Sequence, residues 1–202
     1  MPEKELSTAA RPVFSTYSLT VCALLTALSV VLARVLTLIP AETTRISLEA
    51  VPIVLAGLLC GALPGALVGF SADLIGCLIS PFGYNPIFCV PPILYGLLAG
   101  LLRRYVLEKP TLPRTALAFF PAALFGSVLW QSMALALVYG GDAKQAFFLT
   151  KLVSRSIQFA LTGGVDTLIV WLLLRRGALS SVQRHIRTKG GRRHDDQSAA
   201  GR

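Results

Sequence analysis

Five polar side chains recur along one predicted helix at a spacing that places them on a single face. They follow one another at steps of four, three, four and four residues: Lys151, Arg155, Gln158, Thr162 and Asp166. This is the period of an α-helix. The segment around them is apolar, and an ionisable side chain inside a membrane is costly unless it has a partner or a function. The stripe can therefore line a cavity that faces the outside, together with Gln131 from the preceding apolar segment.

Other ionisable residues lie in or beside apolar segments. Arg45 and Glu49 are expected to frame the outer mouth of a helix bundle, and Asp73 lies near the middle of a segment. Asp73 has Arg34 or Arg155 as a plausible partner. Arg34, Asp73 and Asp166 are accordingly predicted to be buried charges that hold the structure. For any single residue of the stripe, structural pairing explains its presence as well as binding does; the whole stripe favours a site.

Several kinds of chemistry find no support in the residue pattern. The two histidines, His185 and His194, are near the end of the chain, so the apolar part offers neither a histidine base nor an HExxH metal site. A phosphate-binding Walker loop is also absent from the sequence, so this chain is not itself predicted to be an ATPase. We predict no catalytic residue, cofactor or metal. A membrane enzyme using Asp73 and Asp166 is a less favoured alternative, and a structural subunit without a ligand is a third.

The composition places these residues in a membrane protein. The 202 residues are 54% hydrophobic and 14% charged, whereas soluble domains are about 45–50% apolar and about 25% charged. Six apolar segments are visible, at 17–39, 48–60, 63–79, 87–103, 116–138 and 147–174. The sequence therefore predicts an all-α integral membrane protein built as a bundle of six transmembrane helices. The second segment is short, which suggests a partial or tilted span supported by protein neighbours.

The basic residues predict the orientation of the bundle. They gather between the fourth and fifth segments and after the sixth: Arg103, Arg104, Lys109, Arg114, Arg175 and Arg176. The positive-inside rule then places both termini in the cytoplasm. We expect a cytoplasmic segment at 1–16, a membrane domain at 17–176 that contains the site, and a basic, disordered cytoplasmic tail at 177–202. Binding of this tail to nucleic acid or anionic lipid is the less favoured alternative.

Two further features of the apolar segments are pairs of small residues and a turn that ends a helix. Ala23 and Ala27 form a small-xxx-small step that lets another helix approach closely, and Gly65 and Gly69 repeat it. The turn PFGYNP at 81–86 ends the third segment, and Pro86 can begin the fourth. In the predicted orientation this turn faces outward.

Three runs of the sequence resemble a known family. They are RISLEAVPIVLAG at 45–57, GALPGALVGFSADLIG at 61–76 and YNPIFCVPPILYGLLAG at 84–100. They are similar to the substrate-binding S components of energy-coupling factor (ECF) vitamin transporters, and to the folate family among these. The resemblance extends over about residues 19–176, and the tail lies outside it.

The resemblance implies a six-helix bundle that captures a vitamin from outside the cell. It also implies partners: a transmembrane coupling subunit, which Ala23 and Ala27 would contact, and two cytoplasmic ATPase subunits. Substrate would lie in the outer half of the bundle, beneath the loops that follow the first, third and fifth segments. We expect a multi-pass protein of a bacterial cell membrane, embedded in the lipid bilayer and without a nucleic-acid partner.

Folate itself is a dianion with a flat pterin ring, which suits cations together with aromatic or polar side chains. Arg45, Lys151 and Arg155 could meet its carboxylates, whereas Tyr84, Asn85 or Trp130 could meet the ring. Gln131 and Gln158 complete the predicted substrate site. An S component for another vitamin or a cofactor precursor is the principal alternative.

Overall fold

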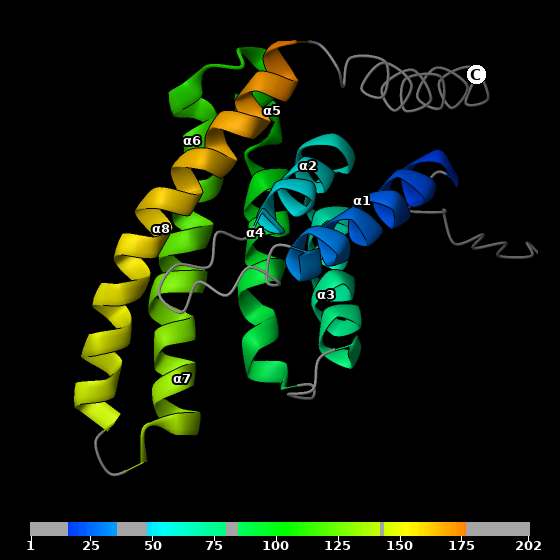
Figure 1. Cartoon of the computed structure of the whole chain (residues 1–202). Coiled ribbons are helices and arrows are strands. Elements are labelled where there is room, and N and C mark those ends of the chain that lie inside the picture. Colours follow the sequence, from blue (N-terminus) through cyan, green and yellow to red (C-terminus); the bar gives the residue numbers. More distant parts are fainter. Residues whose placement is uncertain (1–15, 36–47, 80–84, 142–143, 177–202) are drawn as a thin grey trace, which may run out of the picture.

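The computed structural model describes residues 16–35, 48–79, 85–141 and 144–176. Every regular element in these ranges is helical (Figure 1), which confirms the all-α class. Four helical segments are long and apolar enough to cross a membrane: Thr16–Ala33, Ala62–Ile79, Leu112–Val138 and Lys144–Arg175. The chain is therefore a multi-pass membrane protein. Of the predicted terminal segments 1–16 and 177–202, only Thr16 lies within the described residues.

The helices coincide with the six predicted apolar segments. The first three are α1 (Thr16–Val35), α2 (Ala50–Cys60) and α3 (Ala62–Ile79). A 3-10 turn η2 (Pro86–Cys89) continues into α4 (Val90–Leu101), and α5 (Arg103–Glu108) follows. The last two segments are a rod of α6 (Leu112–Ala122), η3 (Ala123–Trp130) and α7 (Gln131–Tyr139), and then α8 (Lys144–Arg175). The helices Ala50–Cys60 and Pro86–Leu101 are shorter than a full span, so the six-span count stays a prediction.

The short helix α2 lies inside the protein. Its eleven residues extend about 17 Å, roughly half of a hydrocarbon core of about 30 Å. All its residues from Ala50 to Leu59 are buried, as the short second segment led us to expect. The Ser29 hydroxyl of α1 donates a hydrogen bond to the Glu49 carbonyl oxygen at 2.9 Å. Glu49, the residue before α2, is itself exposed, and its place at the outer mouth stays a prediction.

Glycines bring α2, α3 and α4 into backbone contact. A Cβ atom added to Gly96 of α4 would overlap the carbonyl group of Gly65 in α3, and one added to Gly57 of α2 would overlap the carbonyl oxygen of Gly96. Gly69 meets Pro92 in the same way. Small residues allow this approach because they remove the side chain between two helix backbones. The partner of the Gly65 and Gly69 step is therefore α4.

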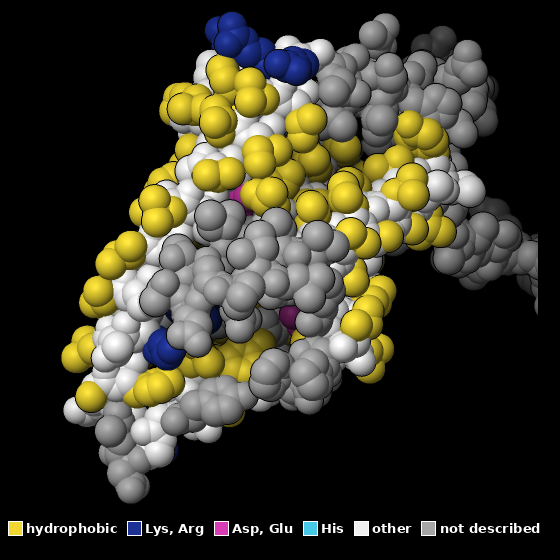
Figure 2. Space-filling view, viewed as in Figure 1, with side chains coloured by type: hydrophobic (Ala, Val, Ile, Leu, Met, Phe, Trp, Pro, Cys, Tyr) yellow, Lys and Arg dark blue, Asp and Glu magenta, His cyan; other side chains and the backbone are white. Residues whose placement is uncertain are grey.

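The rod α6–η3–α7 packs beside α4, which lies between it and α3, and α8 packs along the rod and against α2 (Figure 1). The η3 segment is π-helical, a geometry that often marks functional sites and that the sequence did not predict. The outer face of α8 presents large apolar side chains, including Leu149, Val153, Ile157 and Leu161, each about 60% exposed. Figure 2 shows many apolar side chains on the described part of the face in view, as a lipid-facing protein requires.

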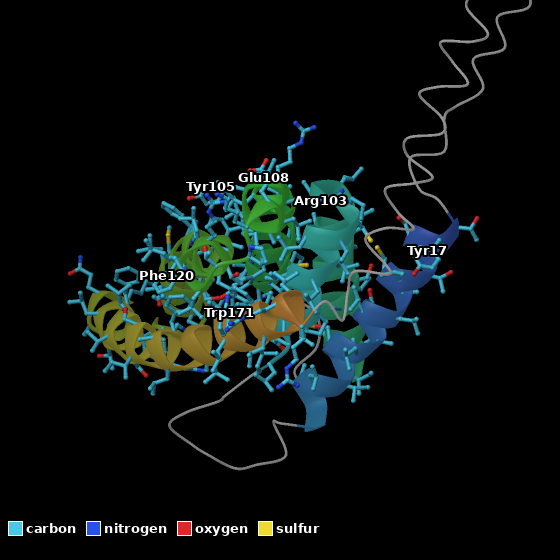
Figure 3. All side chains as sticks on the ribbon, turned by 90° about the horizontal axis from the view of Figure 1, so that it is seen from above. Tyr17, Arg103, Tyr105, Glu108, Phe120 and Trp171 are labelled. Carbon is cyan, nitrogen blue, oxygen red and sulfur yellow. The ribbon has the colours of Figure 1, made fainter. Side chains whose placement is uncertain are left out.

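The two ends of the bundle differ in their residues. At the end opposite Asn85, the short α5 buries Val106 and exposes Arg104 and Tyr105. The Arg114 guanidinium lies 4.3 Å from the centroid of the Tyr105 ring. The Trp171 indole donates a hydrogen bond to the Pro110 carbonyl oxygen at 3.2 Å. Figure 3 looks down on this end, where Arg103, Tyr105 and Glu108 lie near one another and Trp171 comes from α8.

We predict that Gly96→Val destabilises the protein by about 2 kcal/mol or more, because the new side chain must separate α3 from α4. Gly164→Ala is the matched control, since a Cβ atom there meets nothing within 4 Å and alanine favours a helix over glycine. Thermal unfolding in detergent, followed by size-exclusion chromatography, measures both. A Gly96→Val variant as stable as the wild type would contradict the close contact.

Candidate functional site

Two predicted site residues meet across the last two long helices. The Arg155 guanidinium of α8 donates a hydrogen bond to the Gln131 side-chain oxygen, the first residue of α7, at 2.9 Å. Both side chains are half-buried. A hydrogen bond from a charged donor is shorter and stronger than a neutral one, so it holds the guanidinium in place. The structure thus joins the stripe on α8 to the residue that the sequence proposed as its neighbour.

Trp130 and Asn85 are brought together by one backbone segment. The Trp130 indole N–H donates to the Ile87 carbonyl oxygen at 2.8 Å, and the Ile87 N–H donates to the Asn85 side-chain oxygen at 3.2 Å. Asn85 therefore caps η2, with Pro86 as the next residue. The Asn85 side-chain oxygen and the Trp130 indole N–H are therefore both engaged in hydrogen bonds to the backbone of Ile87. The Trp130 ring is 42% exposed and retains its faces for contact with a ligand.

Lys151 and Gln158 lie about one turn on either side of Arg155. Both are half-buried, on the side of α8 opposite the exposed apolar residues. The Lys151 ammonium lies 5.4 Å from the centroid of the Phe147 ring, within the range of a cation–π interaction. The polar stripe is thus a real face of α8, and its cations occupy the half of the helix nearer Asn85.

Four predicted residues are not placed in this way. Arg45 and Tyr84 lie outside the described residues, as does the side chain of Arg34, whose backbone belongs to α1. Asp73 is half-buried on α3. Its pairing with Arg34 or Arg155 stays a prediction.

A second polar group lies deeper in the bundle. Asp166 of α8 is only 4% exposed, and within the described part of the chain its Oδ1 atom has no hydrogen-bond partner. Glu49, at the start of α2, lies close enough for its charge to act on Asp166. Tyr95 of α4 is within electrostatic range of both carboxylates, and its hydroxyl is hydrogen-bonded to that of Ser127 in η3 at 3.2 Å. The Tyr95–Ser127 hydrogen bond joins α4 to η3 at this place, whereas Glu49 is itself exposed.

The sequence did not identify Tyr95 and Ser127 as parts of a site. Each is an isolated polar residue in an apolar run, so neither produces a periodic pattern. Ser127 also belongs to the π-helical segment, where the side-chain directions depart from the period of an α-helix. Tyr95 itself packs edge-on against Phe119, with ring centroids 6.3 Å apart. The only available indication was that hydroxyl groups inside a membrane helix need hydrogen-bond partners.

Ala23 and Ala27 belong to another surface. Both are exposed on α1 and line a groove of about 680 Å³ between α1 and α3. Apolar residues form most of its walls, including Leu19, Val31, Leu67 and Ile75. This groove shares none of the polar residues of α7 and α8 described above.

The fold and this arrangement agree with comparisons to known proteins. Residues 17–174 match the family model for the substrate-specific component of ECF transporters. The chain belongs to this family. The resemblance inferred from the three sequence runs is thereby confirmed for the ECF family. A substrate-specific component has to hold a small molecule, and the polar face of α8 is the candidate place for it.

A solved structure shows the same fold. The chain is similar to a protein described as FolT in a crystal structure bound with folic acid, with a TM-score of 0.63 and 23% sequence identity. The match covers 80% of this chain and 95% of that chain. At this identity the likeness establishes the fold. No curated protein gives a significant match.

We predict that Trp130→Phe loosens the start of η2, because the Ile87 carbonyl loses its donor. The expected loss of about 1 kcal/mol corresponds to roughly five-fold faster amide exchange at Ile87 and Phe88. Hydrogen–deuterium exchange with mass spectrometry measures it. Trp171→Phe is the matched control, since it removes the bond to Pro110 and should leave η2 unchanged. Equal exchange of η2 in Trp130→Phe and wild type would refute this role for the indole.

Proposed function

We propose that this ECF component binds folate or a closely related vitamin from outside the cell. The observation that carries the proposal is the hydrogen bond between Arg155 and Gln131, because it fixes a cation on the polar face of a membrane helix. The similarity in fold to FolT, whose structure contains folic acid, supports folate as the ligand. Another vitamin or cofactor precursor is the alternative.

The chemistry of folate suits the residues that meet at this place. Arg155 and Lys151 supply positive charge for its carboxylates, and a guanidinium can bind a carboxylate with two parallel hydrogen bonds. Gln131 and Gln158 offer amide groups beside them, and the exposed ring of Trp130 and the half-buried Asn85 offer surfaces for an aromatic ligand. Arg45 and Tyr84 complete the proposed set from segments outside the described residues.

The proposed orientation places the Asn85 end outside and both termini in the cytoplasm. It is supported by the cations at the other end, where Arg103, Arg104, Lys109 and Arg114 lie close in sequence to α5 and Arg175 and Arg176 follow α8. Aromatic residues also mark the ends of membrane helices, and Trp171 and Tyr105 occupy this end (Figure 3). We propose six helical segments in the membrane, two of them shorter than a full span, in a bacterial cell membrane.

Transport in this proposal requires partners that supply the energy. A transmembrane coupling subunit would contact Ala23 and Ala27, and two cytoplasmic ATPase subunits would complete the transporter. The exposed groove between α1 and α3 supports this arrangement, because small side chains let a partner helix approach.

A thermal-shift panel of vitamins on the detergent-solubilised protein tests the ligand. We expect folic acid to raise the unfolding temperature, and Arg155→Gln to weaken its binding by about 10- to 100-fold through loss of a charged hydrogen bond. Arg104→Gln, at the opposite end, is the control and should bind normally. Stabilisation by a different vitamin, with none by folic acid, would replace folate with that ligand.

The coupling face has its own test. Ala23→Leu or Ala27→Leu should abolish uptake by the assembled transporter while leaving the affinity of the isolated component within about two-fold, because the added side chain fills the groove outside the polar site. Leu24→Phe is the control, since Leu24 is 67% exposed and does not line the groove. Loss of ligand binding in the alanine variants would assign these residues to the fold.

A further inference from the structure

We infer that Asp166 forms the inner end of the substrate site and selects ligands that carry N–H donors at their buried end. This inference rests on the proposed function and deepens it, because it assigns a direction to the bound ligand. The carboxylate end of the ligand would meet Arg155 and Lys151. A flat ring with adjacent N–H groups would meet Asp166.

The first support is the state of the Asp166 carboxylate. Asp166 is only 4% exposed. Its Oδ1 atom has no hydrogen-bond partner within the described residues. A buried polar atom without a partner is costly, and a charged one more so. A group retained at such a cost calls for a donor that arrives with a ligand.

The second support is the charge around it. Glu49 is the group whose charge acts on Asp166, and it has the same sign, so it does not compensate the burial. Tyr95, which is near both, is hydrogen-bonded to Ser127. Glu49 is exposed, so the buried carboxylate is Asp166 alone, and a carboxylate whose charge is not compensated favours a ligand surface that donates hydrogen bonds or carries positive charge.

The third support is position along α8. Arg155 and Asp166 lie on one face of the helix, about 20° apart at 100° per residue, and about 16 Å apart along its axis. Gln158 and Thr162 lie between them on that face, and the Thr162 hydroxyl is bonded to the Gln158 carbonyl oxygen of its own helix at 2.9 Å. One elongated ligand can therefore meet a cation at one end and a carboxylate at the other.

These features define a ligand class. It is an extended molecule with carboxylates at one end and, at the other, a heterocycle with an amino group next to a ring N–H. Such a pair of donors can bind the two oxygens of one carboxylate in parallel. The pterin ring of folate has this pattern. The sequence placed Asp166 at the end of the polar stripe and predicted that it is a buried charge that holds the structure.

The test compares two ligands that differ only at the ring: folic acid and its analogue with a methyl group in place of the 2-amino group. Binding of each is measured by isothermal titration calorimetry to the full chain in detergent. We expect the wild type to prefer folic acid by at least about 30-fold, and Asp166→Asn to reduce this ratio to below about three-fold. The ratio within one variant is insensitive to a uniform loss of folded protein.

Thr167→Val is the matched control, because Thr167 is also 4% exposed and its hydroxyl has no partner among the described residues, yet it lies one residue further round the helix. Its ratio should equal that of the wild type. If Asp166→Asn does not fold, Tyr95→Phe is measured in its place, and it should lower the ratio by at least about three-fold.

The outcomes separate the two proposals. A wild type that binds neither ligand overturns the proposed folate function and this inference with it. If the wild type binds folic acid and the Asp166→Asn variant keeps the full ratio, the proposed function stands. The assignment of Asp166 to the inner end of the site is then refuted. A variant that is only less stable, with its ratio unchanged, would show that Asp166 holds the structure.

Discussion

Backbone contact among α2, α3 and α4 is the constraint on which the rest of the structure depends. Gly57, Gly65 and Gly96 let three helices meet without side chains between them, and this encloses a helix of only eleven residues. Because α2 is so short, its first turn lies within the bundle, where Ser29 binds the Glu49 carbonyl. Towards the Asn85 end, the polar faces of α7 and α8 are therefore not covered by α2.

The long helix α8 separates two environments. Its exposed apolar residues suit lipid, whereas the opposite face carries Lys151, Arg155 and Asp166, and none of the three is exposed. In a membrane this division is enforced, because a charge turned to the lipid has no compensating group. The two cations and the carboxylate are also separated along the helix. One end of this face is therefore positively charged and the other end negatively charged.

This division explains which parts could be predicted from the sequence. The stripe on α8 and its neighbour Gln131 were recognisable because helical period and membrane polarity act together on every residue there. Ser127 and Tyr95 were not, since a lone hydroxyl gives no period and the π-helical geometry of η3 has no clear sequence signature. Trp130 was predicted as a ligand contact, yet its N–H holds the Ile87 carbonyl. Tertiary hydrogen bonds of this kind depend on which helices meet, and local sequence does not encode that.

Helix α1 connects the groove that it forms with α3 to the start of α2. Helix α1 carries Ala23 and Ala27 on its exposed side and, two residues after Ala27, the Ser29 hydroxyl that binds the Glu49 carbonyl at 2.9 Å. Any displacement of the Glu49 backbone must either move α1 or break this hydrogen bond, at a net cost of about 1 kcal/mol. A change at the start of α2 therefore reaches the groove between α1 and α3 through one residue.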